Sequence, residues 1–302
     1  MMQYDLCLIW YWEHDPEFVA AVQSACIAQG VSPWLVSPKN LVQATSDLLE
    51  GRVGFNVLLD RAQYNPGFLP LLQKAREQGA YCINSRERAN WAEDKATMHL
   101  EMISHGLESP YTIILAPFTE QPILPPIDLG PLGGQFVIKP AVGGGGEGVT
   151  MHATSLEQVL QARIEFADQK YLLQAHIEPQ ELGGRRAWFR IYYVDGKIHP
   201  CWWDPQTHVF APLRADEEGH FGLTPLRLVT TKIASICRLD WFSTEIALSR
   251  DGKFVAVDYV NDGIDLRSQS KAHDGVPDEV IKAIAEDLVT LASRQQKTTP
   301  AN

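Results

Sequence analysis

One lysine of this 302-residue chain lies in a short apolar stretch where its charge needs a partner. The stretch, Phe136-Val-Ile-Lys139-Pro, has the pattern of a strand. Burying an ammonium group without a partner costs free energy, so we expect Lys139 to face an anion. The alternative is an exposed charge on an edge strand, where lysine discourages pairing with other chains.

A glycine-rich run follows this lysine. Its glycines are Gly143, Gly144, Gly145, Gly146 and Gly148. The run matches Gly-x-Gly-x-x-Gly, but the flanking segments both resemble strands, whereas a dinucleotide fingerprint needs a helix after it. The Gly-Lys-Ser/Thr of a P-loop is also missing. The pattern therefore predicts a hairpin loop whose backbone N–H groups can approach a phosphate, with an ordinary glycine-rich turn as the alternative.

Several polar side chains lie on the two strands of a predicted hairpin near the end of the chain. Glu245 is on one strand and Asp258 on the other, and Asn261 and Asp262 follow. Two opposed strands can aim carboxylates at one ion, and Mg²⁺ prefers such hard oxygen ligands. We predict a site for Mg²⁺, or Mn²⁺ in its place, formed by Glu245 and Asp258 together with Asn261 or Asp262. Ordinary turn and solvent-facing acids are the alternative.

Two arginines lie where they can meet a negatively charged substrate. Arg190 is inside the apolar stretch 188–194, and Arg267 comes shortly after the predicted metal ligands. A guanidinium can grip a carboxylate or a phosphate through two parallel hydrogen bonds. Each arginine could instead be a structural ion-pair partner.

The composition argues against several other functions. The 26 basic and 37 acidic side chains give a net charge of −11, which would repel the backbone of a nucleic acid. No apolar run approaches the roughly 18 to 20 residues of a membrane span, and no secretory signal is visible. The five cysteines form no Cys-x-x-Cys pair, and no Ser-His-Asp elbow or His-Glu-x-x-His motif competes for the chemistry. We expect a cytoplasmic protein without nucleic-acid or membrane partners.

The elements that position these residues fall into two regions. Up to about residue 83, short apolar runs alternate with amphipathic stretches, a pattern typical of βαβ units. Strands are expected over residues 5–10, 33–36, 55–59 and 80–83, which predicts a small Rossmann-like lobe. The first strand is followed by Trp10-Tyr-Trp-Glu-His14 rather than by glycines, which argues against a nucleotide site there.

The second region mixes hairpins with helices. Helices are expected over residues 93–105, 156–166 and about 277–293, and strands over 110–115, 135–140, 149–152 and 171–175. Hairpins with Asp-Gly turns are expected over 188–203 and 243–260. A proline-rich loop connects residues 115 and 135. The fold class is therefore α/β in the first region and α+β in the second.

These segments together resemble the ATP-grasp superfamily, nearest to its glutathione synthetase-like and ribosomal-protein glutamate ligase-like members. The resemblance rests on Phe136-Val-Ile-Lys139-Pro with its glycine loop, on Asp94-Lys95 at the head of a helix, and on Leu172-Leu-Gln-Ala-His-Ile-Glu178. It implies a Rossmann-like, pre-ATP-grasp domain over residues 1–90 and a small lobe with the glycine loop over 91–175. A C-terminal lobe with the metal site would cover 176–297, followed by a tail at 298–302.

The resemblance implies that the chain binds ATP with Mg²⁺. Lys95 and Lys139 would hold the phosphates, with Lys139 also beside the adenine, and the glycine loop would close over the triphosphate. Gln174 replaces the family's usual carboxylate beside the adenine, yet an amide can still accept a hydrogen bond from the adenine amine. The nucleotide contacts would be completed by the backbone of Ala175, His176 and Ile177, with no role for the His176 side chain, and by Glu178 at the ribose.

The sequence departs from the family pattern at two further points. Asn261 lies three residues after Asp258 rather than two, so either a β-bulge realigns it or Asp262 acts in its place, and Asp240 is a reserve first ligand. Trp188 occupies the aspartate position of the family's Asp-x-Arg pattern, so that only Arg190 matches. Arg190 would stabilise the transferring phosphoryl group.

The implied activity is an ADP-forming ligation of a carboxylate to an amine, or to a thiol, through an acyl phosphate. The substrates would be small molecules, selected by residues 201–226 and 263–275, and Arg267 could grip the substrate carboxylate. The stretch 202–208 would line this pocket or pack in the core. A kinase of the same fold and a non-catalytic ATP-binding module remain alternatives, and a homodimer is the commonest assembly to expect.

Overall fold

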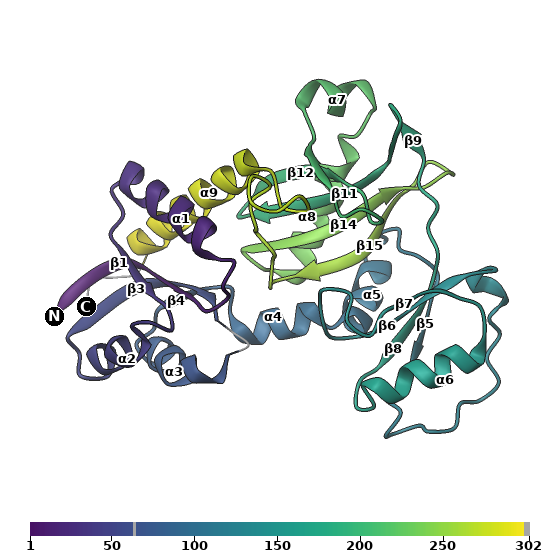
Figure 1. The fold of residues 1–302 in the computed structure, drawn as a ribbon, viewed down its shortest axis with the longest axis horizontal. Coiled ribbons are helices and arrows are strands. Elements are labelled where there is room, and N and C mark those ends of the chain that lie inside the picture. The colour runs from purple at the N-terminus through teal and green to yellow at the C-terminus, as the bar shows by residue number, and fades with distance from the viewer. Residues whose placement is uncertain (63–64, 299–302) are drawn as a thin grey trace.

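The computed structural model describes residues 1–62 and 65–298, so that the predicted tail lies outside the described residues except for Thr298. Besides a two-stranded hairpin, the described residues form three larger sheets, one at the left end of the long axis and two toward the right, one above the other (Figure 1). The first is a parallel sheet in the order β2-β1-β3-β4. Its strands are β1 (Met2–Trp10), β2 (Pro33–Val36), β3 (Val53–Arg61) and β4 (Tyr81–Ile83). All four strands were predicted.

Helices cover both faces of this parallel sheet. They are α1 (Pro16–Gln29) on one face and α2 (Leu41–Leu49) with α3 (Leu69–Glu77) on the other, where the short helix η1 (Pro66–Phe68) precedes α3. The alternation of side chains along β1 explains this layering, because Leu6 and Leu8 face α1 while Cys7 and Ile9 face α2 and α3.

Two helices lead from the first sheet to the second. They are α4 (Arg86–Glu93) and α5 (Lys95–Ser104). The predicted helix over residues 93–105 therefore begins two residues too early, because the helical conformation is interrupted at Asp94. The Asp94 carboxylate accepts a hydrogen bond from the backbone N–H of Thr97 at 2.9 Å and caps α5.

The second sheet is antiparallel, in the order β5-β8-β6-β7, and α6 (Leu156–Glu165) packs against it. Its strands are β5 (Thr112–Leu115), β6 (Phe136–Pro140), β7 (Thr150–Ala153) and β8 (Tyr171–Ala175), with η2 (Gly130–Leu132) in the proline-rich connection. The glycine run connects β6 to β7 as a hairpin loop, as predicted.

The third sheet is also antiparallel, in the order β13-β12-β11-β14-β15. Its strands are β11 (Trp188–Val194), β12 (Lys197–Trp203), β13 (Phe210–Pro212), β14 (Trp241–Leu248) and β15 (Phe254–Asn261). Both predicted hairpins are present. The remaining elements here are the small hairpin of β9 (Glu181–Leu182) and β10 (Arg185–Arg186), and the helices α7 (Ala215–His220) and α8 (Pro225–Cys237).

The last helix, α9 (Asp278–Thr298), returns to the first sheet and packs beside α1 (Figure 1). Its apolar face, which includes Ile284 and Leu288, shares one core with Phe18 of α1 and Trp241 of β14. The two ends of the sequence therefore stabilise each other. Within the described residues, no helix is long and apolar enough to cross a membrane.

Candidate active site

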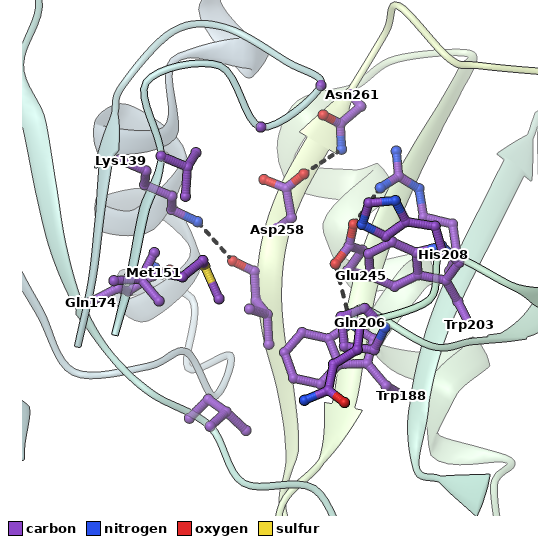
Figure 2. Close-up of a pocket in the computed structure, with 18 of the residues that line it drawn as sticks. Lys139, Met151, Gln174, Trp188, Trp203, Gln206, His208, Glu245, Asp258 and Asn261 are labelled. Carbon is purple, nitrogen blue, oxygen red and sulfur yellow. Dashed lines mark hydrogen bonds and ion pairs between the residues drawn. The ribbon is translucent and has the colours of Figure 1, made fainter. Parts of the chain in front are cut away.

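A cavity of about 1200 Å³ lies between the second and third sheets. Figure 2 shows Lys139, Met151 and Gln174 on one side of it, Trp188, Trp203 and Glu245 on the other, and Asp258 with Asn261 between them. All the predicted nucleotide, metal and catalytic residues line this cavity except Gly148. The fold thus brings together residues that are more than 170 positions apart in the sequence, such as Lys95 and Arg267.

Lys139 points from the second sheet toward the third. It is 7% exposed, and β6 lies between β8 and β7, which excludes the alternative of an edge-strand charge. Its Nζ donates to the carbonyl of Val257 at 3.1 Å and lies 5.4 Å from the centre of the Tyr259 ring. Burial lowers the pKa of Lys139, and the Asp258 carboxylate opposes this effect.

The second lysine reaches the same region from the start of α5. Lys95 is 9% exposed, and its Nζ donates to the carbonyl of Gly143 at 2.6 Å. This bond joins the helix directly to the glycine loop. Lys95 and Lys139 both act on the charge of Asp258, so the two ammonium groups and this carboxylate form one electrostatic unit.

The glycine loop adopts backbone conformations that favour glycine. The φ angles are +125° at Gly143, +63° at Gly145, +78° at Gly146 and +69° at Gly148. A Cβ on Gly148 would lie 2.5 Å from the Phe166 ring, so this glycine is also required by packing. Gly143 to Gly146 line the cavity with their backbone, as a phosphate-covering loop requires.

The predicted metal ligands come from two neighbouring strands. Glu245 on β14 pairs with Asp258 on β15, and Ser243 pairs with Asn261. One residue of β14, Thr244, therefore lies opposite two residues of β15, Tyr259 and Val260, which is the β-bulge that the sequence spacing left open as one of two alternatives. Because of the bulge, Asn261 lines the cavity, and its Nδ2 donates to Asp258 Oδ2 at 2.9 Å.

The two reserve ligands lie elsewhere. The Asp262 carboxylate accepts a hydrogen bond from Asn84 Nδ2 at 2.6 Å, and the Asp240 carboxylate accepts one from the Tyr81 hydroxyl at 2.7 Å. Neither residue lines the cavity. The geometry therefore favours Asn261 over Asp262 as the partner of Asp258.

The two carboxylates that were predicted as metal ligands have pKa values shifted in opposite directions. Burial raises the pKa of Asp258, but the charges of Lys95 and Lys139 outweigh it and lower the pKa to about 2. Burial raises the pKa of Glu245, and the charge of Arg190 only opposes this. Asp258 is therefore ionised at neutral pH and is the stronger candidate to bind a cation.

Arg190 and Trp188 both contact Glu245. Arg190 on β11 lies opposite Glu245 in the sheet and forms an ion pair with it, and its Nη2 donates to Ser243 Oγ at 3.0 Å. Trp188 Nε1 donates to Glu245 Oε2 at 3.2 Å. Trp188 thus supports the neighbouring carboxylate of Glu245.

The residues predicted to contact the nucleoside follow one another along β8 and beyond its end. Gln174 is 2% exposed, and its Nε2 donates to the Tyr259 hydroxyl at 2.7 Å. His176 and Ile177 line the cavity after it, and Glu178 forms an ion pair with Arg250. The sequence did not single out Tyr259, because an aromatic residue in an apolar strand is usually only a core residue.

Arg267 also lines the cavity, where it already forms ion pairs with Asp265 and Asp274. Its Nε donates to Asp265 Oδ2 at 2.9 Å and its Nη2 to Asp274 Oδ2 at 3.0 Å. A role in gripping a substrate carboxylate therefore stays a prediction. Asp274 and Phe210 also line the cavity, within the stretches 263–275 and 201–226 that were expected to select the substrate, although the sequence did not single them out. Arg186, in the two-residue strand β10, was not expected in the cavity, and so short a strand carries no periodic signal in the sequence.

The stretch 202–208 is divided between the cavity and the core. Trp203, Gln206 and His208 line the cavity, with the Trp203 and His208 rings stacked at 5.7 Å (Figure 2). Trp202 is 3% exposed and packs against Phe189 in the core. Both alternatives for this stretch are therefore realised.

Comparison with known proteins places this geometry in a known fold. No protein-family model and no curated protein sequence matches the chain. Among solved structures, D-alanine–D-alanine ligase from Bacillus anthracis, complexed with ATP, matches with a TM-score of 0.65 at 13% identity, over all of both chains.

Two further structures give the same result. The ATP-grasp ligase PsnB, complexed with a minimal precursor, Mg and ADP, has a TM-score of 0.61 at 15% identity, over 98% of this chain and 100% of its own. A RimK-domain ATP-grasp protein from Sphaerobacter thermophilus has a TM-score of 0.61 at 19% identity, over 93% and 98%. The chain therefore has the ATP-grasp fold, as the resemblance seen in the sequence implied.

Proposed function

We propose that this chain is an ATP- and Mg²⁺-dependent ligase that joins a small-molecule carboxylate to an amine, or to a thiol, and releases ADP and phosphate. The observation that supports it most is the arrangement around the cavity. Lys95, Lys139 and Arg190 bring three cations to the two carboxylates Asp258 and Glu245, beside a loop of glycine backbone. Such a mixture of charges suits a triphosphate bound together with a divalent cation.

The residues present fit Mg²⁺. Asp258, Glu245 and Asn261 offer hard oxygen donors, and nucleotide-bound Mg²⁺ commonly uses one or two carboxylates together with phosphate oxygens. Within the described residues, no three or more His, Cys, Asp or Glu side chains gather into a group that could hold a metal ion. When bound, Mg²⁺ would neutralise charge on the phosphate oxygens.

The chain's own residues would act through position and charge. Lys95 and Lys139 would hold the phosphates, and Arg190 would stabilise the charge that develops when the substrate carboxylate attacks the γ-phosphorus. The products of this step are an acyl phosphate and ADP. The amine would then displace phosphate from the acyl carbon. The glycine loop would exclude water, which otherwise hydrolyses the acyl phosphate.

The neighbouring structures agree in reaction type, since their descriptions include ligases complexed with ATP or with Mg and ADP. The proposal extends to finer points of organisation. The parallel sheet would be the Rossmann-like leading domain over residues 1–90, followed by lobes over 91–175 and 176–297. A cytoplasmic location and a homodimer stay predictions from the sequence.

One observation favours a nucleotide-binding module without turnover as the second candidate. Glu245 is already bonded by both Arg190 and Trp188, which competes with its use as a metal ligand. Such a module would bind Mg·ATP through Asp258 and release no ADP.

Release of ADP by the purified protein distinguishes the candidates. The assay uses Mg·ATP with a panel of amino acids and small carboxylates, each with and without an amine. ADP release that depends on both the carboxylate and the amine supports the ligase. Release without an amine, with a phosphorylated product, identifies a kinase, and binding of ATP without any release identifies the binding module.

A further inference from the structure

A buried side-chain amide, that of Gln174, lines the cavity where the proposed function places the nucleobase. Its nitrogen and its oxygen have different surroundings. Gln174 is 2% exposed, and its Nε2 donates to the Tyr259 hydroxyl at 2.7 Å. In the described part of the chain, its Oε1 accepts no hydrogen bond and is not among the fully enclosed polar atoms. Gln174 lines the cavity, and Figure 2 shows it on the same side as Lys139 and Met151. The carbonyl oxygen is therefore the polar atom that a ligand can reach.

The Tyr259 hydroxyl is itself held in place from a third element. Its oxygen lies 2.7 Å from Nδ1 of His99, which is on α5 and is 5% exposed. Burial lowers the pKa of His99, so the imidazole is neutral at neutral pH and can accept a hydrogen bond at one ring nitrogen. Tyr259 can then accept from Gln174 and donate to His99. The hydrogen bonds that link His99, Tyr259 and Gln174 therefore connect α5, β15 and β8 beside the cavity.

We propose that Tyr259 and His99 are positioning residues that orient the Gln174 amide and thereby select a 6-aminopurine nucleotide over a 6-oxopurine nucleotide. The inference rests on the proposed function, in which this end of the cavity holds the base of ATP. Neither Tyr259 nor His99 lines the cavity, so both act through Gln174.

The chemistry of an amide explains why such positioning is needed. A carboxylate at this position can only accept, so it meets a 6-amino group correctly in either rotation. An amide rotated by about 180° presents its NH₂ instead, which pairs with a 6-oxo group. When Tyr259 holds Nε2, the amide presents Oε1 to the base. The 6-oxo oxygen of the base then faces another acceptor, and leaving both oxygens unpaired lowers the affinity.

The test compares the dissociation constants of Mg·ATP and Mg·ITP, whose base carries a 6-oxo group, by calorimetry. Wild type is expected to prefer ATP by at least roughly tenfold, as sites that pair with a specific polar group do. Tyr259→Phe should lower this ratio by about tenfold, because the amide can then rotate. Tyr193→Phe is the matched control, since it removes a hydroxyl from a tyrosine that packs on Phe242 outside the cavity. It should leave the ratio unchanged.

Gln174→Glu gives a second arm, and this single variant does not depend on how well Tyr259→Phe folds. It should keep the preference for ATP, and in that background Tyr259→Phe should no longer change the ratio. An unchanged ratio in Tyr259→Phe with Gln174 present would overturn the inference, as would equal affinities of wild type for ATP and ITP. A wild type that binds neither nucleotide would overturn the proposed function, and this inference with it.

Discussion

The buried charges of the cavity depend on one another at the scale of single residues. A buried charge is costly unless it is paired, and the pairing here extends across four strands and one helix. Asp258 is held ionised by Lys95 and Lys139, while Glu245 is paired with Arg190. Replacing one member should therefore alter stability as well as function.

Asp258→Asn tests this charge balance through the free energy of unfolding. The pKa of Asp258 falls from 3.8 to about 2 in the folded state, so its ionised form stabilises the fold above about pH 4. This contribution is lost as the pH falls through about 2. We expect a lower urea midpoint than wild type at pH 5 and a smaller difference at pH 3. A difference of the same size at both pH values would contradict the assignment.

Lys139→Met separates stability from function. The substitution removes an ammonium whose pKa burial lowers, but it also leaves the Asp258 carboxylate with one cation fewer. The two effects oppose each other, so the melting temperature should fall only slightly. The affinity for Mg·ATP should fall by more than about tenfold, because a phosphate contact is lost. Lys282→Met, on the exposed face of α9, is the control for both readouts. A marked loss of stability without loss of binding would show that Lys139 is structural.

Some of these residues could be predicted from the sequence, and the reason is physical. Lys139 and Arg190 stand out because a charge within an apolar strand requires a partner. Tyr259 and His99 do not, because an aromatic side chain on a strand or helix is compatible with simple burial. Only the contact between three distant elements reveals their role.

At the scale of elements, the hairpins were predictable because their turns are local. Gly196 and Gly252 have φ angles of +87° and +83°, which the Asp-Gly turns require. The β-bulge on β15 was one of two alternatives that the spacing left open. The helix α8 begins at Pro225 and carries a readable apolar stripe through Leu226 and Ile233, yet no helix was expected there.

Gly148→Ala tests whether the glycine loop needs its conformation. The substitution places a Cβ at a φ of +69° and 2.5 Å from the Phe166 ring, so it should lower the free energy of unfolding by about 1 to 3 kcal/mol. Gly144→Ala is the matched control, since its φ is not positive and nothing lies within 4 Å of the added Cβ. Urea denaturation measures both. Equal effects would mean that the loop does not hold this conformation.

At the scale of the whole molecule, the first and last parts of the chain share one core. Arg61, at the end of β3, pairs with Asp15, and its Nη2 donates to the carbonyl of Ile264 at 3.0 Å. Its guanidinium also lies 5.0 Å from the centre of the Phe18 ring. Arg61 thus joins the parallel sheet to the segment that continues from Ile264 along the cavity. Such long-range packing leaves no local pattern from which it could be predicted.

Arg61→Met tests this connection. The side chains of Arg61 and Asp15 are 7% and 2% exposed, so the substitution leaves a buried carboxylate unpaired. The expected cost is about 3 to 5 kcal/mol in the free energy of unfolding. Arg52→Met removes an arginine that is 46% exposed from its ion pairs and should cost less than about 1 kcal/mol. Similar losses for the two variants would argue against a connecting role for Arg61.

The central claim is that the cavity activates a carboxylate by phosphorylation, and trapping with hydroxylamine tests it most directly. The purified protein would be incubated with Mg·ATP, a panel of carboxylates and hydroxylamine, a small nucleophile that converts an acyl phosphate into a hydroxamate. We predict that hydroxamate forms in equal amount to ADP with at least one carboxylate, and that Lys139→Met and Asp258→Asn abolish it. ADP formed without hydroxamate across the panel, or hydroxamate formed equally by both variants, would contradict the account.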